Sequence, residues 1–514
     1  YQAFEDYLLP TGSTVPQEIE PDLGRDASAY LERRAAELDA KMRFVSGRAR
    51  RGQLDGVEIT DGELYVARIR RPDEKAAFEA STRLYGMLPR VRITELLAEV
   101  DRWTGFSERF LHLRTGRSCE DRPTLLAAIL ADGTNLGLAR MADASRGLAY
   151  HHLVNVAQWH VSDDGYADAR AAIVDVHRGH PMASLWGDGT TASADGQFFR
   201  TSGRGAQHGD VNARHGIDPG AVMYTHLSDQ YGPFHTRVIS AAVSEAPYVL
   251  DGLMQHHHRS GLRIREFYTD SAGATDLVFG LAHLLGFRFA PRIKDLKDRR
   301  LYVFEHGVKP SVLEPLVGGR IDAAAIAEQW PALLRLAASL KAGTVAPSVM
   351  LRKLAAAGRH NVLGHALRQL GRIERTGFVL DWLSDPALRL RSHAGLNKGE
   401  AMNALRRAVF FHRQGEIRDR TFENQSYRAS GLSLVTAAIV HWNTVYLHRA
   451  VEVLRAGGAD LADKAIAQVA PLGWEHISLT GDYVWNAVAR EDEFRPLREV
   501  SRFVPEPARL SVQL

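Results

Sequence analysis

The feature that most constrains the fold is a change in sequence texture at His180-Pro181. From there, small, β-branched and aromatic residues alternate with glycine-rich turns over about ninety residues, a pattern typical of strands. Before and after this stretch, apolar residues recur at helical spacing. The sequence therefore predicts a chain of class α/β plus all-α, with a sheet in the middle and helical regions on both sides.

The strand-rich stretch has a definite order of elements. Three predicted strands come first, and a helix, a strand, a helix and a last strand follow. This order fits a layered domain built around a mixed sheet. The predicted strands are 183–199 (in one or two pieces), 221–228, 236–243, 262–268 and 287–291, and the predicted helices are 247–257 and 275–285.

The remaining sequence predicts helices joined by short connections, with one hairpin near the start. We divide the chain into a mostly helical part (1–180), an α/β core (181–300), a helical insertion (301–390) and C-terminal helices (391–514). The predicted helices are 26–46, several within 73–177, 310–316, 321–341, 348–357, 361–375, 380–384, 398–413 and 433–454, and the hairpin strands are 57–60 and 64–69.

Composition narrows the class of protein. The chain has 64 Lys and Arg against 61 Asp and Glu, a formal net charge of +3, so any affinity for nucleic acid must come from local basic patches. The single cysteine, Cys119, excludes an internal disulfide framework. No apolar run approaches the ~20 residues that span a bilayer, and the first residues do not resemble a signal peptide. We expect no membrane partner and a cytoplasmic location, and a start at Tyr1 instead of Met suggests a fragment of a longer protein.

Three separated acidic segments offer carboxylates for chemistry. Asp270 ends the strand-like run LRIREFYTD and precedes a predicted helix. A carboxylate between a strand end and a helix start lies at the rim of an α/β sheet, where reactive groups commonly gather. An ordinary turn or helix-start aspartate is the alternative interpretation.

The first acidic segment, WGDGTTASADGQFF, contains two candidates. Asp188 follows an apolar run and precedes Gly189, so it suits a turn or a strand end. Asp195 lies within a predicted strand, where alternation places it on one face with Ser193 and Gln197. A carboxylate in the middle of a strand is costly to bury unless it is paired or coordinated. This cost favours a metal ligand, and both aspartates remain open at this point.

The third segment, LNKGEAMNALRRAVFF, contains Glu400. Asn397 suits an N-cap, which would place Glu400 in the first turn of a helix. A glutamate there can simply stabilise the positive end of the helix dipole. Glu416 and Glu423, farther along the chain, are alternatives to Glu400.

Three carboxylates far apart in sequence suit a two-metal site. Two Mg²⁺ ions roughly 4 Å apart can activate a water or hydroxyl on one side of a phosphate and stabilise the leaving oxygen on the other. Hard oxygen ligands suit Mg²⁺, which keeps several waters, so that few carboxylates suffice. Phosphate-binding loops and Rossmann glycine patterns are not visible in the sequence, which disfavours nucleotide-hydrolysing motors.

Basic residues flank the acidic segments. Such residues supply sequence-independent affinity for the phosphates of nucleic acid. Solvated helix faces with local aspartate partners are the alternative interpretation. The candidate DNA-contacting residues are Arg292, Lys294, Lys297, Arg299, Arg300, Arg418, Arg420 and Arg428.

Many ordered blocks of the sequence resemble the Tn-three family of replicative transposases. They lie between Leu125 and Trp485 and include LAAILADGTNLGLARMADAS, WGDGTTASADGQFF, YTDSAGATDLVFGLAHLLGFRFAPRIKDLKDRRLY, LNKGEAMNALRRAVFF and GEIRDRTFENQSYRASGLSLV. The resemblance implies an RNase-H-like domain with a catalytic aspartate, aspartate, glutamate triad. It matches this triad to Asp195, Asp270 and Glu400, which would bind two Mg²⁺ or Mn²⁺ ions.

The resemblance also implies a function. Such a protein is a DNA transposase: a phosphodiester at a transposon 3′ end is hydrolysed, and the freed 3′-hydroxyl attacks target DNA to form a cointegrate. The implied partners are double-stranded DNA and a second copy of the chain, in the bacterial cytoplasm at the nucleoid. The region 1–180 is then a connector, a dimer scaffold or a DNA-binding region. Alternatives are a transposon-end-binding module without catalysis and an RNase-H-like nuclease without strand transfer.

Overall fold

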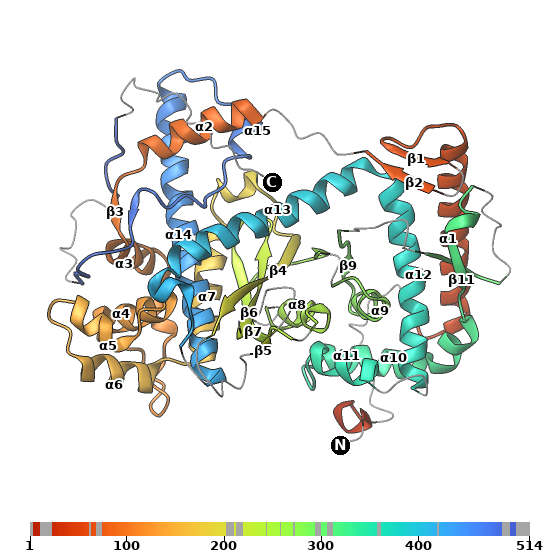
Figure 1. The fold of residues 1–514 in the computed structure, drawn as a ribbon, viewed down its shortest axis with the longest axis horizontal. Coiled ribbons are helices and arrows are strands. Elements are labelled where there is room, and N and C mark those ends of the chain that lie inside the picture. Colours follow the sequence, from red (N-terminus) through yellow and green to blue (C-terminus); the bar gives the residue numbers. More distant parts are fainter. Residues whose placement is uncertain are drawn as a thin grey trace.

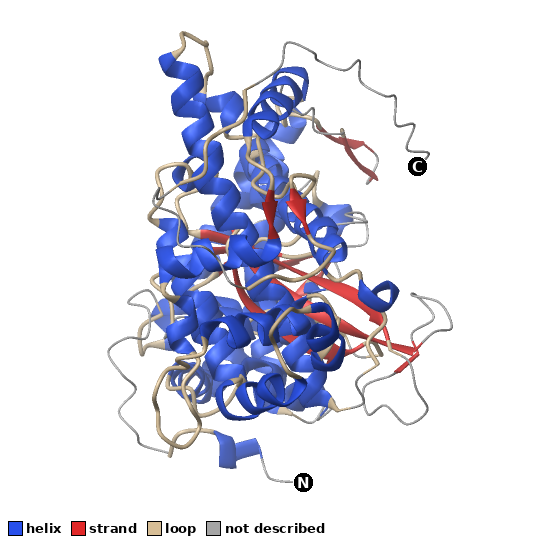
Figure 2. Cartoon of the chain, turned by 90° about the vertical axis from the view of Figure 1, so that its left-hand side faces the viewer, coloured by secondary structure: helices blue, strands red, loops and turns tan. Residues whose placement is uncertain are grey.

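A central sheet lies between two groups of helices in the computed structural model of this chain (Figure 1). In the turned view, the strands run through the middle of the molecule with helices around them (Figure 2). No helix in the described part is long and apolar enough to cross a membrane. The structure describes residues 4–10, 23–60, 63–67, 74–201, 210–211, 219–242, 244–256, 259–270, 273–292, 300–305, 312–356, 361–418, 421–485 and 494–499.

The central sheet is mixed, and its described strands are β4 (Thr191–Arg200), β5 (Asp210–Val211), β6 (Pro219–Ser228), β7 (Pro233–Ser240), β8 (Glu266–Tyr268) and β9 (Arg288–Phe289). β4, β6 and β7 form an antiparallel meander, and β5 pairs with the start of β6. β8 runs parallel to β4 on its other edge, and β9 runs parallel to β8. The predicted mixed sheet is therefore confirmed.

Three predicted strands are shorter than expected, and the one predicted at 287–291 is only the two residues of β9. The strand predicted at 183–199 begins only with β4. Its first residues form a 3₁₀ helix, η3 (Ala183–Leu185), closed by hydrogen bonds from the Leu185 N–H to the Met182 carbonyl at 3.2 Å and from the Trp186 N–H to the Ala183 carbonyl at 3.1 Å. The strand predicted at 262–268 pairs only over β8, because its partner β4 has not yet begun at the earlier positions.

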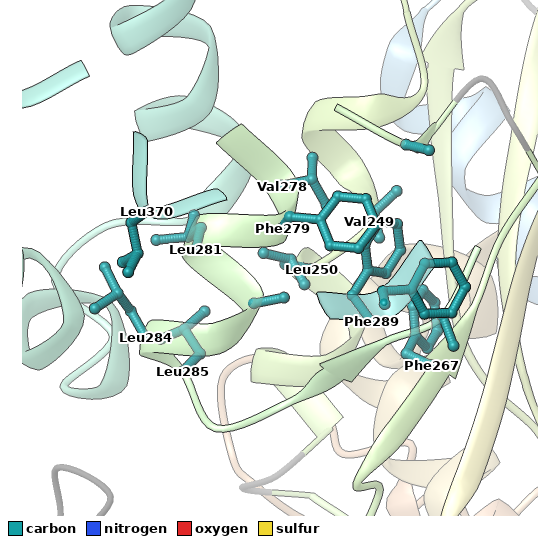
Figure 3. Packing of buried hydrophobic residues seen from close by; sticks show 14 of the residues in the cluster. Val249, Leu250, Phe267, Val278, Phe279, Leu281, Leu284, Leu285, Phe289 and Leu370 are labelled. Atoms are coloured by element: carbon teal, nitrogen blue, oxygen red, sulfur yellow. The ribbon is translucent and has the colours of Figure 1, made fainter. Parts of the chain in front are cut away.

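Helix α9 (Asp276–Leu284) joins the sheet to one of the two helical groups. Its apolar side chains lie between the sheet and helix α12 (Val362–Ser384), as Figure 3 shows. The rings of Phe279 in α9 and Phe289 in β9 have centroids 4.8 Å apart. Gly371 in α12 permits this packing, because a Cβ there would lie 1.7 Å from a backbone oxygen of α9.

The N-terminal helix predicted at 26–46 is confirmed as α1 (Ala27–Arg50). It packs against α12, which lies more than 300 residues later in the sequence. The predicted hairpin is confirmed as an antiparallel pair. This helical group forms one hydrophobic core with the face of the sheet that carries Ala192 and Ala194. Its other elements are β1 (Val57–Thr60), β2 (Glu63–Val66), α10 (Ala323–Lys341) and α11 (Pro347–Ala356).

Helix α14 (Phe422–Ala456) is the axis of the second helical group (Figure 1). Helix α4 (Arg122–Gly133) approaches α14 closely where Gly133 of α4 meets Gly431 of α14. A Cβ at Gly133 would lie 2.9 Å from the Gly431 carbonyl oxygen. This group forms the second hydrophobic core. Its other helices are α2 (Glu74–Met87), α3 (Ile93–Thr104), α4 (Arg122–Gly133), α5 (Leu138–Ala144), α6 (Tyr150–His160) and α7 (Asp163–Arg178).

Helix α13 (Pro386–Val409) crosses in front of the sheet from one helical group to the other (Figure 1). The helix predicted at 398–413 therefore starts much earlier, and the prediction that Asn397 caps it is wrong. Asp385 is the N-cap, because its carboxylate accepts from the Ala387 N–H at 2.8 Å and proline follows it. Glu400 thus lies in the helix interior, where the helix-dipole explanation does not apply.

Two features of the predicted helical insertion also differ. The helices predicted at 361–375 and 380–384 are one continuous helix, α12. The end of the helix predicted at 310–316 is a 3₁₀ helix, η8 (Glu314–Leu316), which leads into a short parallel sheet that the sequence did not predict. This sheet consists of β10 (Leu301–Val303) and β11 (Val317–Arg320).

Candidate active site

Asp195 and Asp270 come from neighbouring parallel strands. β4 and β8 pair so that Ser193 lies opposite Tyr268, and each aspartate lies two positions farther along its own segment. Because the two strands run in the same direction, both aspartates lie toward the same end of this strand pair. Asp195 is within β4, and Asp270 follows the end of β8.

Helix α13 lies across the face of β4 that carries Asp195. Gly399 lies next to Asp195, since a Cβ there would be in ordinary contact with the Asp195 Cβ at 3.7 Å. The side-chain amide of Asn403 donates to Asp195 Oδ2 at 2.7 Å, and Gln197 Nε2 donates to the Asn403 carbonyl at 3.0 Å. Glu400 follows Gly399 in this helix and is exposed.

The three predicted carboxylates share one electrostatic environment. Burial raises the pKa of Asp195, the negative charge of Asp270 raises it further, and Glu400 adds a smaller effect in the same direction. Hydrogen bonds from the Gly196 N–H and from Asn403 oppose this rise. Asp195 is therefore a partly buried carboxylate near two like charges, an arrangement that a bound cation would stabilise.

The site is open in its present geometry. Within the described ranges, no three His, Cys, Asp or Glu side chains already stand close enough together to hold a metal ion. A small cavity borders Asp195 and is lined by Ser193, Thr225, Leu227, Gly399, Met402 and Asn403.

The alternative carboxylates have other surroundings. Asp188 is exposed in the turn before β4, where it accepts from the Thr190 N–H at 2.9 Å. Glu416 pairs with Arg418 at 3.5 Å. Glu423 lies in the first turn of α14. The structure therefore brings Asp195 within electrostatic range of Asp270 and Glu400, and it gives Asp188 and Glu416 local partners.

Two buried cations beside the site were not anticipated from the sequence. Lys398 Nζ donates to the carbonyls of Trp186 (2.8 Å) and Asp229 (2.6 Å), and burial lowers the pKa of Lys398 to about 8. Burial also lowers the pKa of Arg406, to about 10, while the charge of Asp195 opposes this effect. Both lie on α13.

The predicted DNA-contacting residues differ in exposure, and some of them lie outside the described residues. Arg292 lies beside the site, because its N–H donates to the Thr269 carbonyl at 2.8 Å, and Arg300 and Arg418 are exposed. For Arg428, the predicted contact with DNA is wrong. This residue is 8% exposed, and its guanidinium pairs with Asp132 of α4 at 2.6 Å, so it stabilises the fold. Lys294, Lys297, Arg299 and Arg420 lie outside the described residues.

Comparison with known proteins adds an independent line of evidence. A family model described as "Tn3 transposase DDE domain" matches residues 95–483. The transposase for transposon Tn501 of Pseudomonas aeruginosa is 50% identical over 510 residues, which cover 97% of this chain and 51% of that protein. The transposase for transposon Tn21 of Escherichia coli is 48% identical, with 97% and 51% covered, and that for Tn1546 of Enterococcus faecium is 41% identical, with 97% and 50% covered. The chain spans about half the length of the curated relatives it matches.

Proposed function

Because this chain belongs to the Tn3 transposase DDE domain family, we propose that it is the catalytic portion of a DNA transposase. The observation that carries the proposal is the grouping of Asp195, Asp270 and Glu400. Asp195 lies in β4, Asp270 lies two residues past the end of the adjacent parallel strand β8, and Glu400 lies on the helix that crosses them. Rigid elements of this kind hold reactive groups more reproducibly than loops do.

We extend the proposal to the fold of the catalytic part, which we take to be RNase-H-like. The order β7-β6-β4-β8-β9 supports it. Three antiparallel strands are followed by two strands parallel to the first of them. Each of the last two strands is reached through a helix, first α8 (Asp251–His256) and then α9.

The residues present fit a pair of divalent ions, Mg²⁺ or Mn²⁺. The three side chains offer hard oxygen ligands, and Asp195 is partly buried near the negative charges of Asp270 and Glu400, which a cation would neutralise. The chemistry that two such ions supply when bound is activation of a water or 3′-hydroxyl and stabilisation of a leaving oxygen. Asp195 and Asp270 would hold them from the sheet, and Glu400 would complete the set from α13.

The surrounding residues would bind and orient DNA. Arg292 is next to the strand end that carries Asp270, and Arg300 and Arg418 present exposed guanidinium groups. We propose that these residues contact the phosphate backbone. Lys294, Lys297, Arg299 and Arg420 belong to the same proposal on the basis of sequence alone.

The proposed reaction has two steps. Water first hydrolyses the phosphodiester at a transposon 3′ end, and the freed 3′-hydroxyl then attacks a phosphodiester of target DNA, so that one bond forms as another breaks. A homodimer on two DNA ends, a cointegrate product and a cytoplasmic location at the nucleoid are parts of this proposal. They rest on the family alone.

Substitution of Asp270 tests the proposal. With Mg²⁺ or Mn²⁺ and DNA that contains a transposon end, the wild-type chain is expected to nick and join strands. Asp270→Asn should abolish both activities and leave thermal unfolding intact, whereas Asp188→Asn, in an exposed turn, should remain active. Full activity of Asp270→Asn would contradict the catalytic assignment. Binding without cleavage by the wild-type chain would favour an end-binding module, and cleavage without joining would favour a nuclease.

A further inference from the structure

The contact between β4 and α13 contains two hydrogen bonds that run in opposite directions. The Asn403 side chain donates to the carboxylate of Asp195 at 2.7 Å, and the Gln197 side chain donates to the backbone carbonyl of Asn403 at 3.0 Å. Asp195 and Gln197 lie two positions apart on the same face of the strand. One helix position, Asn403, is therefore tied to both of them.

These bonds form where the helix and strand are closest. A Cβ at Gly399, one helical turn before Asn403, would be in ordinary contact with Asp195 and Ser193, at 3.7 Å from Cβ and 3.9 Å from Oγ. Glu400 lies in this same turn of α13. The position of Glu400 relative to Asp195 therefore depends on how this turn is seated on β4.

Gln197 is retained in this contact at a cost. Its residue is 5% exposed, and its Oε1 has no hydrogen-bond partner among the described residues. A buried acceptor without a partner costs roughly 1–3 kcal/mol. An apolar side chain of similar size would avoid that cost, so the donor to Asn403 is the feature that an amide adds here.

The Asn403 bond also fixes how the carboxylate is turned. Each carboxylate oxygen has about two acceptor positions. In Asp195 one oxygen accepts from Asn403 and the other accepts from the adjacent Gly196 N–H at 3.0 Å. Both oxygens therefore keep an acceptor position, and rotation of the carboxylate would break one bond or the other.

We infer that Asn403 is a positioning residue that orients the Asp195 carboxylate for divalent-metal binding, and that Gln197 holds Asn403 in place. This inference rests on the proposed function. Groups that hydrogen-bond to metal ligands typically contribute about 10- to 100-fold to metal affinity or activity. Neither residue touches the reacting DNA in this assignment.

The test compares two asparagines on the same helix. Asn403→Ala removes the donor, and Asn397→Ala makes the same chemical change at an exposed position of α13, with the same gain in helix propensity. Binding of Mn²⁺ to the DNA-free chain is measured by calorimetry. We expect Asn403→Ala to weaken Mn²⁺ binding by about 10-fold or more and Asn397→Ala to leave it unchanged.

Two further variants separate orientation from general loss of structure. Gln197→Met keeps the size of the side chain without its donor and is expected to weaken Mn²⁺ binding by a smaller factor, about 3- to 10-fold. Asn403→Gln keeps the amide and is expected to recover part of the affinity that Asn403→Ala loses. If Asn403→Ala unfolds, the Gln197→Met and Asn403→Gln results decide the inference.

The outcomes distinguish this inference from the proposed function. If Asp195→Asn abolishes Mn²⁺ binding but Asn403→Ala and Gln197→Met bind as tightly as Asn397→Ala, the inference is overturned and the metal site stands. If Asp195→Asn leaves Mn²⁺ binding unchanged, the proposed metal site fails and the inference fails with it. No improvement of Asn403→Gln over Asn403→Ala would also overturn the role given to the amide.

Discussion

The two faces of the central sheet bury acidic side chains in opposite ways. On the α13 face, the charges of Asp270 and Glu400 raise the pKa of Asp195, Arg406 is a nearby cation, and the two hydrogen bonds of the Asp195 carboxylate come from neutral groups. On the opposite face, the Asp251 side chain is fully buried, but Arg237 pairs with it at 2.6 Å and the Ser348 N–H donates to it at 2.8 Å. Asp251 has a direct ion pair within the protein, whereas the charges of Asp270 and Glu400 act against the ionised form of Asp195.

Strand alternation explains how one sheet carries both arrangements. Asp195 in β4 is aligned with Thr225 in β6, whereas Arg237 in β7 is aligned with Tyr224, the preceding position. Successive side chains point to opposite faces. Burial raises the pKa of both aspartates, but Ser348 and Arg237 lower that of Asp251, while Asp270 raises that of Asp195 further. The comparison separates a structural carboxylate from one suited to metal binding.

The largest expected difference between the two aspartates is in catalytic activity. Asp195→Asn is expected to lower metal-dependent nicking by at least about 1,000-fold, because a neutral amide cannot replace an anionic ligand in a two-metal site. The measurement is a single-turnover nicking assay on end-containing DNA. Asp251→Asn is the matched control and should keep activity within a few-fold at a temperature where it is folded. Equal losses would mean that the two faces do not differ in role.

The free energy of unfolding should depend more on Asp251 than on Asp195. Asp251→Ala is expected to lower the free energy of unfolding by about 3 kcal/mol, since it leaves Arg237 without its partner and the Ser348 N–H without an acceptor. Urea unfolding measures this loss. A double-mutant cycle with Arg237→Ala should give a coupling of at least about 1 kcal/mol. Additive effects would show that the ion pair does not matter to the fold.

Low pH should lower the free energy of unfolding, because a histidine is buried on the sheet face that carries Asp251. His226 is fully buried against the Val249 carbonyl (3.0 Å), and burial lowers the pKa of His226 to about 4 from 6.5. Because the folded state favours the neutral ring, its contribution to stability is full above pH 6.5 and is lost as pH falls toward 4. The expected loss at pH 4.5 is about 2–3 kcal/mol. Urea unfolding at pH 7 and pH 4.5 should show a smaller loss for His226→Gln than for the wild type, and equal losses would refute the assignment.

The smallest expected effect is a change in the melting temperature, and its sign differs between the two aspartates. The pKa of Asp195 is raised in the folded state, so at neutral pH its ionised form opposes folding. In the presence of a metal chelator, Asp195→Asn should therefore raise the Tm by about 1–3 °C, whereas Asp251→Asn should lower it. Scanning calorimetry measures both shifts. A lower Tm for Asp195→Asn would argue that this carboxylate stabilises the fold.

Local patterns predicted the sheet and many of the helices. The strand predicted at 221–228 became β6, which is buried on both faces, and the helix predicted at 275–285 became α9, whose apolar residues are buried along its length. The approximate places of Asp195 and Asp270 followed from these elements. The family resemblance, and not the local pattern, selected Asp195 over Asp188.

The start of α13 shows where local patterns fail. Gly395 and Asn397 look like a break before a new helix, yet both lie inside α13. A Cβ at Gly395 would lie 2.4 Å from the ring of Tyr268 in β8. The glycine therefore serves close packing between a helix and a strand far away in sequence. No local rule distinguishes such a glycine from one that ends a helix.

The sequence by itself determined the kinds of residue available, the strand and helix periods, and the family blocks that mark three carboxylates. Only the tertiary structure decided that α1 packs on α12, that Arg428 is paired in the interior, and that α13 crosses β4 with Asn403 on Asp195. The physical reason is that periodicity records how each element meets its surroundings. The choice of neighbour depends on close contacts, such as those at Gly371 and Gly399, that form only when distant segments meet.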